Sequence, residues 1–121
     1  MQYTLLIYTP EADGSEAPEE LKKMMDEYWV YEAWLIEKGW KRAGEALHET
    51  AQATTVRVRG GETTSTDGPF AETKEQLGGF YLLECDNIDQ ALEAAARCPG
   101  SHYGSVEVRP VIDFAQVQAT S

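Results

Sequence analysis

The sequence predicts an α+β domain with a ferredoxin-like plan, in which two helices cover one face of a mainly antiparallel sheet. Three observations lead to this prediction: two stretches with helical periodicity, strand-like stretches on either side of each, and a Gly-Gly hairpin signal in the middle of the chain. The resulting order is β-α-β-(ββ)-β-α-β. We expect one domain over residues 1–113, followed by a loosely held tail over residues 114–121.

The first half begins with a strand over residues 2–8, QYTLLIY, whose nearly continuous apolar run suits the centre of a sheet. Helical periodicity follows from Glu19 to about Lys38, with Pro18 near its start and Gly39 just past its end. The predicted apolar stripe of this helix consists of Leu21, Met24, Met25, Tyr28, Leu35 and Ile36.

Three residues of this helix depart from a simple amphipathic pattern. Glu32 falls inside the apolar stripe, and a carboxylate that faces inward needs a partner or a wet cavity. Val30 and Trp34 fall among the charged residues, which suggests a contact with another molecule, although single apolar residues are common on protein surfaces.

The middle of the chain predicts a strand and then a hairpin. Over residues 41–49, KRAGEALHE, alternation divides the side chains between two faces: Ala43, Glu45 and Leu47 on one, and Gly44, Ala46 and His48 on the other. In the hairpin, Val56 and Val58 alternate with arginines, and the two-residue turn Gly60-Gly61 pairs Arg59 with Glu62.

The second half predicts a strand over residues 79–85, a helix that Asn87 caps and Pro99-Gly100 ends, and a last strand over residues 105–113. The strand GFYLLEC is apolar on both sides, but the helices of one chain cover only one face of the sheet. We therefore expect a homodimer, in which the uncovered face meets another sheet.

Composition limits the possible partners. Twenty-one acidic residues against 10 basic ones give a net charge of −11, so nucleic acid and anionic membrane surfaces are poor partners. No apolar run resembles a signal peptide or a membrane span, and we expect a cytoplasmic protein. Cys85 and Cys98 lack metal-ligand spacing and read as buried thiols. Without a nucleotide or metal motif, we expect no cofactor.

The stretch TDGPFAETKEQLGGF contains the candidate catalytic residue Asp67. An aspartate at a turn usually accepts from the N–H two residues on, but Pro69 has none, so the carboxylate is left to reach Phe70 N–H or to point elsewhere. Held beside the Phe70 ring, Asp67 would suit the role of a general base; alternatively, it merely stabilises its own turn. Thr73 and Gln76 have capping-box spacing, which predicts one helical turn over KEQL.

These residues suggest a small-molecule site in a cleft between the sheet and the first helix. Asp67 would be the acid or base, with Glu32 or Glu45 as a second carboxylate. The candidate binding residues are Tyr28, Trp29 and Phe70 as walls, together with Lys74 and His48. For Glu32, Glu45, Lys74 and His48, a structural or solvent-exposed role remains the alternative. Proton abstraction, isomerisation or hydrolysis of a polar organic molecule would fit such a site.

The stretch TDGPFAETKEQLGGFYLLEC, with QYTLLIY and YGSVEVRPV, resembles the YCII-related proteins of the DGPF type over about residues 1–113. The resemblance implies a dimeric α/β-barrel of two ferredoxin-like sheets packed face to face. It also implies that Asp67 corresponds to the Asp of a His–Asp pair found in some members. The histidine expected after the first strand is absent, since the chain reads YTPEADGS there.

An alternative hypothesis is a non-catalytic regulatory partner. DGPF-type proteins resemble this chain and are often encoded beside, or fused to, alternative sigma factors. The net charge of −11, with Val30 and Trp34 on the charged side of the first helix, would suit a basic protein partner such as a sigma factor.

Overall fold

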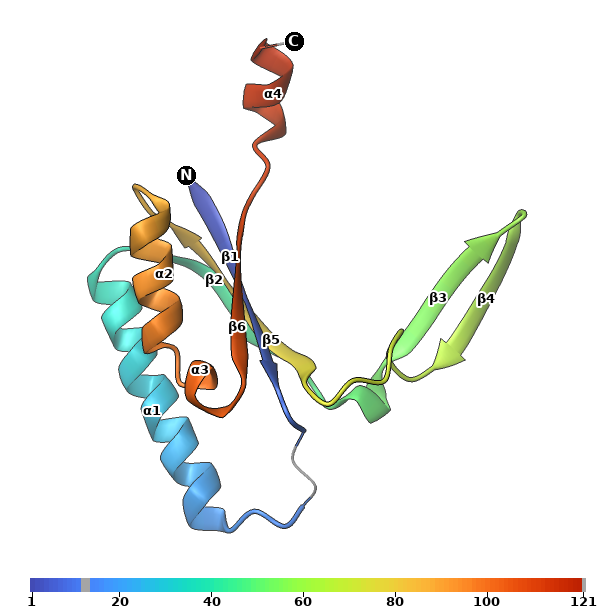
Figure 1. Ribbon diagram of the computed structural model, residues 1–121, viewed down its shortest axis with the longest axis horizontal. Helices are drawn as coiled ribbons and strands as arrows, with labels where there is room; N and C mark the ends of the chain where they lie inside the picture. The colour runs from blue at the N-terminus through green and yellow to red at the C-terminus, as the bar shows by residue number, and fades with distance from the viewer. Residues whose placement is uncertain (12–13, 121) are drawn as a thin grey trace.

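The computed structural model describes residues 1–11 and 14–120 and confirms an α+β fold with an antiparallel sheet (Figure 1). The predicted order of the main elements is also confirmed. The elements are β1 (Gln2–Thr9), α1 (Pro18–Glu37), β2 (Lys41–Ala46), the 3-10 turn η1 (Thr50–Gln52), β3 (Thr54–Arg59), β4 (Glu62–Asp67), β5 (Gln76–Glu84), α2 (Ile88–Arg97), α3 (Gly100–Tyr103), β6 (Ser105–Pro110) and α4 (Phe114–Thr120). None of the helices in the described part of the chain has the length and hydropathy needed to cross a membrane.

The main sheet has the strand order β2-β5-β1-β6, which is compatible with a ferredoxin-like fold, and each neighbouring pair is antiparallel. Helices α1 and α2 lie on the same side of it in Figure 1. Alternation then divides the sheet residues. Tyr81 and Leu83 face the helices and are buried, whereas Phe80 and Leu82 belong to the opposite, open face. The sheet is therefore apolar on both faces but covered by helices on one.

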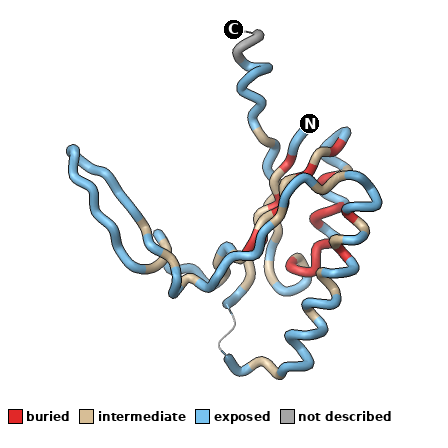
Figure 2. Tube along the Cα trace, turned by 180° about the vertical axis from the view of Figure 1, so that it is seen from behind, coloured by how far each residue is buried: buried red, intermediate tan, exposed pale blue. Residues whose placement is uncertain are grey.

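The core lies between the sheet and the two helices, as the buried segments in Figure 2 show. From α1 it receives Tyr31 and Leu35, and the Tyr31 hydroxyl donates a 2.7 Å hydrogen bond to the Ala94 carbonyl of α2. The predicted stripe is confirmed for Leu35 but wrong for Met25 and Ile36, which are 60% and 64% exposed. The periodicity located the helix but set its buried face slightly wrong, because α1 packs against both the sheet and α2.

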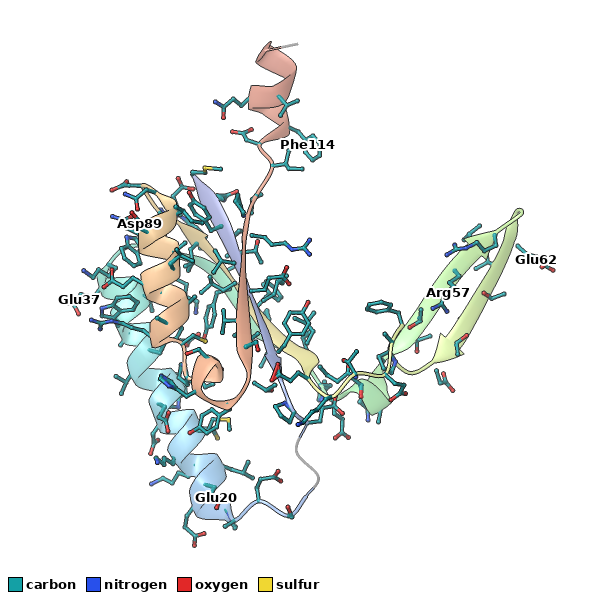
Figure 3. All side chains as sticks on the ribbon, viewed as in Figure 1. Glu20, Glu37, Arg57, Glu62, Asp89 and Phe114 are labelled. Atoms are coloured by element: carbon teal, nitrogen blue, oxygen red, sulfur yellow. The ribbon has the colours of Figure 1, made fainter. Side chains whose placement is uncertain are left out.

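The inserted hairpin forms an arm, which we define as residues 54–67 of β3 and β4 (Figures 1 and 3). The predicted turn is confirmed: Arg59 pairs with Glu62, and Gly60 and Gly61 take φ values of 59° and 79°, which glycine adopts without strain. The arm projects on the side of the sheet opposite to α1 and α2. It is a separate two-stranded sheet and not an extension of the main one.

One prediction of local structure is wrong. The KEQL stretch forms no helical turn, because β5 begins at Gln76, which pairs with Thr9 of β1; the Gln76 side chain instead donates to the Thr73 carbonyl at 2.9 Å. Sheet pairing therefore overrides the capping-box spacing. The tail contains the helix α4, which stands beyond the end of the sheet in Figure 1.

Candidate functional site

A cavity of about 930 Å³ lies between the first part of α1 and the helix-facing side of the sheet. Strands β1, β2 and β5 and the short helix α3 complete its walls. Four of the predicted site residues are among its lining residues: Tyr28, Trp29, Glu32 and Glu45. The N-terminal half of α1 stands away from the sheet here, which explains why Leu21 and Met25 are exposed although they belong to an apolar stripe.

Glu32 is a carboxylate of this cavity that two side chains hold in place. Its Oε1 atom accepts from Lys41 Nζ at 2.9 Å and from the Tyr81 hydroxyl at 3.3 Å. The Lys41 and Glu32 side chains are 23% and 30% exposed, so this ion pair is only partly shielded from water. The prediction that Glu32 needs a partner or a cavity is confirmed: it has both. Carboxylate, ammonium and phenol thus meet at one point, where Glu32 and Tyr81 line the cavity.

Two glycines make room for the tyrosines of the cavity. A Cβ at Gly44 would lie 2.5 Å from the ring of Tyr81, and a Cβ at Gly100 would lie 2.9 Å from the Tyr28 hydroxyl. Real Cβ atoms do not approach other atoms this closely, so side chains at these positions would displace the two rings. The tyrosine positions therefore depend on glycines of β2 and α3.

Burial raises the pKa of the tyrosines and of the thiol beside the cavity. Burial, and then the Glu32 carboxylate, raise the pKa of Tyr81 above its ordinary value of 10.0. For Tyr28, burial is again the larger cause of the raised pKa, and Cys98 is the second. The Cys98 thiol, 3.9 Å from the Tyr28 hydroxyl, is fully buried, and burial raises its pKa too. At neutral pH these hydroxyls are hydrogen-bond donors.

Glu45 lines the cavity differently from Glu32. It pairs with Phe80 across β2 and β5, whereas its neighbour Gly44 pairs with the helix-facing Tyr81. Since directly paired residues share a face, the Glu45 side chain belongs to the open side of the sheet. Its backbone carbonyl is next to Gly79, and both residues line the cavity: a Cβ at Gly79 would lie 3.0 Å from the Glu45 carbonyl oxygen. The structure thus separates the carboxylates of Glu32 and Glu45.

The remaining predicted site residues lie outside the cavity lining. Asp67 ends β4 at the base of the arm, and Phe70, three residues on, is 81% exposed. His48 and Lys74 are exposed in the loops after β2 and before β5. Among the described residues the Asp67 carboxylate has no hydrogen-bond or ion-pair partner. As predicted from Pro69, its usual turn bond is not made.

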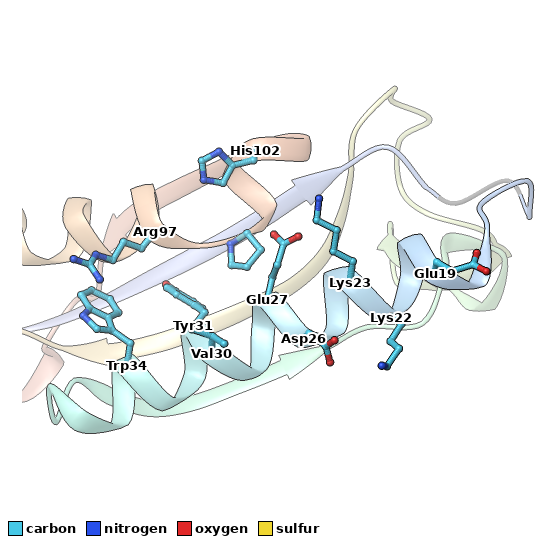
Figure 4. Close-up of a pocket in the computed structure, with 11 residues that line it drawn as sticks. Glu19, Lys22, Lys23, Asp26, Glu27, Val30, Tyr31, Trp34, Arg97 and His102 are labelled. Carbon is cyan, nitrogen blue, oxygen red and sulfur yellow. The ribbon is translucent and has the colours of Figure 1, made fainter.

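A second groove, of about 870 Å³, runs along the other side of α1 beside α2 and α3 (Figure 4). Here the expectation for Trp34 is wrong: its ring stacks on Tyr31 at 6.1 Å, and the Arg97 guanidinium lies 4.4 Å from its centroid. Trp34 is thus part of the contact between α1 and α2. The regulatory-partner hypothesis keeps only Val30, which is 72% exposed, and the net charge of −11 as support.

Sequence reasoning missed Lys41 and Tyr81. Tyr81 was assigned to an apolar strand, and nothing in the periodicity showed that its hydroxyl would reach α1. Lys41 opens β2 and follows Glu32 by nine residues, so the helix–strand turn brings the two together. In the part of the chain that the structure describes, no cluster of three or more histidine, cysteine or acidic side chains could hold a metal ion.

Comparisons with known proteins show which family the chain belongs to. The model of the YCII-related domain matches residues 1–115. The uncharacterised protein R00369 of Rhizobium meliloti (strain 1021) is 40% identical over 114 residues, which cover 92% of each chain. A solved structure, the 5-chloro-2-hydroxyhydroquinone dehydrochlorinase (TftG) of Burkholderia phenoliruptrix AC1100 in complex with 2,5-dihydroxybenzoquinone, is 17% identical, with a TM-score of 0.49 over 96% of this chain and 98% of that one. By the match over residues 1–115, the chain belongs to the YCII-related family.

Proposed function

We propose that the cavity between α1 and the sheet binds a small polar organic molecule, with Glu32 as its central polar group. One observation carries this proposal: a partly shielded carboxylate, held by Lys41 and Tyr81, stands in the wall of a cavity of about 930 Å³. Ligand sites typically combine an apolar hollow of this size with a few convergent polar groups. The rings of Tyr28 and Trp29 supply flat surfaces beside that polar centre.

The chemistry that this arrangement offers is proton transfer. An ionised Glu32 can accept a proton from a bound C–H or O–H acid, while Lys41 and Tyr81 can donate hydrogen bonds to an oxygen where negative charge develops. Abstraction, isomerisation or hydrolysis would each use this division of roles. Asp67 remains a proposed second acid or base. It lies outside the cavity lining, so it would act at a separate site formed with another copy.

We also propose that the protein works as a homodimer, with the open faces of two sheets packed together as in an α/β-barrel. Leu6 and Leu82, on the central strands β1 and β5, support this because they give the open face an apolar centre. Such a surface is stabilised by a second layer.

The binding proposal is tested by screening small polar aromatic and carbonyl compounds for thermal stabilisation of the protein. Compounds that bind the cavity should lose most of their effect with Glu32→Gln and keep it with Glu37→Gln. Glu37 is an exposed residue of the same helix, so it controls for the loss of one negative charge. Hits that respond equally to both substitutions would place the ligand elsewhere and refute the proposal.

A further inference from the structure

The arm is a two-stranded hairpin that is largely exposed to water. Every residue of β4 is exposed, and on β3 Val56 and Val58 are 61% and 56% exposed. The two valines pair with Ser65 and Thr63, so they share one face of the hairpin. An isolated hairpin of this kind is marginally stable, and it gains most from packing an apolar face against another surface.

The main sheet presents a second uncovered surface. On its open face Leu6 pairs with Phe80 on one side and with Glu107 on the other, and Glu45 lies beyond Phe80. The row therefore has apolar side chains at its centre and carboxylates at both edges. In an antiparallel sheet such a centre is normally covered by another layer.

The arm and the open face lie on the same side of the molecule, with an angle between them (Figure 1). A strand of six residues is about 20 Å long, and two packed sheets lie about 10 Å apart. Since about 20 Å is greater than about 10 Å, the arm is long enough to reach beyond a second sheet packed on the open face. One partner in the angle can therefore contact both uncovered surfaces at once.

We propose that the partner in this angle is a second copy of the chain, and that each arm clasps the other copy. The proposal rests on the face-to-face dimer proposed above and adds the arm to it. Self-complementarity favours a second copy, because each chain presents both an apolar open face and an arm face with the exposed Val56 and Val58. A two-fold arrangement sets the valine face of each arm against the other copy, so the same contact is made twice.

The clasp gives the segment Asp67–Phe70 a role. It follows β4 at the base of the arm, where the arm and the sheet diverge, so a partner in the angle would lie close to it. The carboxylate of Asp67, without a partner among the described residues, would then face the second copy. Asp67 thereby contributes to a shared site and not to the cavity of its own chain.

Two experiments test the clasp. In the first, p-benzoylphenylalanine replaces Thr63 of β4, which shares the arm face of Val56 and Val58, and unlabelled and ¹⁵N-labelled chains are mixed before irradiation. If the arm contacts another copy, mass spectrometry will find cross-linked peptides that join one light and one heavy chain. In the second, sedimentation measures the dimer dissociation constant. The double substitution Val56→Ser/Val58→Ser should raise it roughly tenfold or more.

Val30→Ser is the matched control, because Val30 is 72% exposed but lies on α1, on the far side of the sheet from the arm. It should leave the dissociation constant within about twofold. A dimer that is indifferent to the arm substitutions, or cross-links confined to single chains, overturns the clasp and leaves the face-to-face dimer standing. A wild-type monomer overturns both. Ligand binding in the α1 cavity is measured separately and depends on neither result.

Discussion

The ion pair of Glu32 and Lys41 is expected to stabilise the fold as well as the site. The two charged atoms are 2.9 Å apart, and the side chains are 30% and 23% exposed. Exposed pairs contribute about 0.2–1 kcal/mol, whereas breaking a fully buried pair costs about 3–5 kcal/mol. Since water still reaches both groups, and Tyr81 donates a further hydrogen bond, we expect a coupling energy of about 1–2 kcal/mol.

A double-mutant cycle with Glu32→Gln, Lys41→Met and the double variant isolates this coupling from the other effects of each substitution. Urea denaturation, followed by circular dichroism, gives the four free energies of unfolding. The control is the same cycle on Glu93 and Arg97, an i,i+4 pair whose nearest charged atoms are 4.0 Å apart. That pair should couple by no more than about 0.5 kcal/mol. Equal coupling in both cycles would refute the claim that Glu32 is held in place.

Three further predictions concern the support of the site. Tyr31→Phe removes the buried 2.7 Å bond to the Ala94 carbonyl and should lower the free energy of unfolding by about 1–3 kcal/mol in urea denaturation. Gly44→Ala, whose Cβ would lie 2.5 Å from the Tyr81 ring, should cost about 1–3 kcal/mol and weaken ligand binding measured by calorimetry; unchanged binding would contradict the packing. Burial raises the pKa values of Tyr28, Tyr31 and Tyr81 in the fold above 10.0. The burial of these neutral tyrosines therefore stabilises the fold fully below pH 10, and this stabilisation is lost as the pH rises beyond it. Tyrosinate absorbance of these residues should appear together with alkaline unfolding and not before it.

Much of the fold followed from local patterns. The apolar run of β1, the Asn87 cap of α2 and the Gly60-Gly61 turn are each decided by neighbouring residues, and each is found in the structure. The missing turn bond of Asp67 was also predictable, because Pro69 has no N–H to donate. Glu32 stood out as a carboxylate inside an apolar stripe, and this was the most useful site signal in the sequence.

The predictions that failed concern contacts between residues that are distant in sequence. A helical projection assumes one covered face, but α1 contacts both α2 and the sheet. Trp34 therefore packs against Arg97, and Ile36 remains exposed. The Tyr81–Glu32 contact joins residues 49 positions apart and required the packing of α1 on β5. The direction of the arm, which separates Asp67 from Glu32, is set by the chain between β2 and β3, where no periodicity exists to interpret.

The three tryptophans offer the most direct test of the cavity as the ligand site. Trp29 lines the cavity beside Glu32, Trp34 lines the groove on the other side of α1, and Trp40 packs against Trp34. In ¹H–¹⁵N spectra recorded during titration with a screening hit, we expect the indole N–H signal of Trp29 to shift in the wild type and to stay in place with Glu32→Gln. Shifts confined to Trp34 and Trp40 would contradict the proposed function.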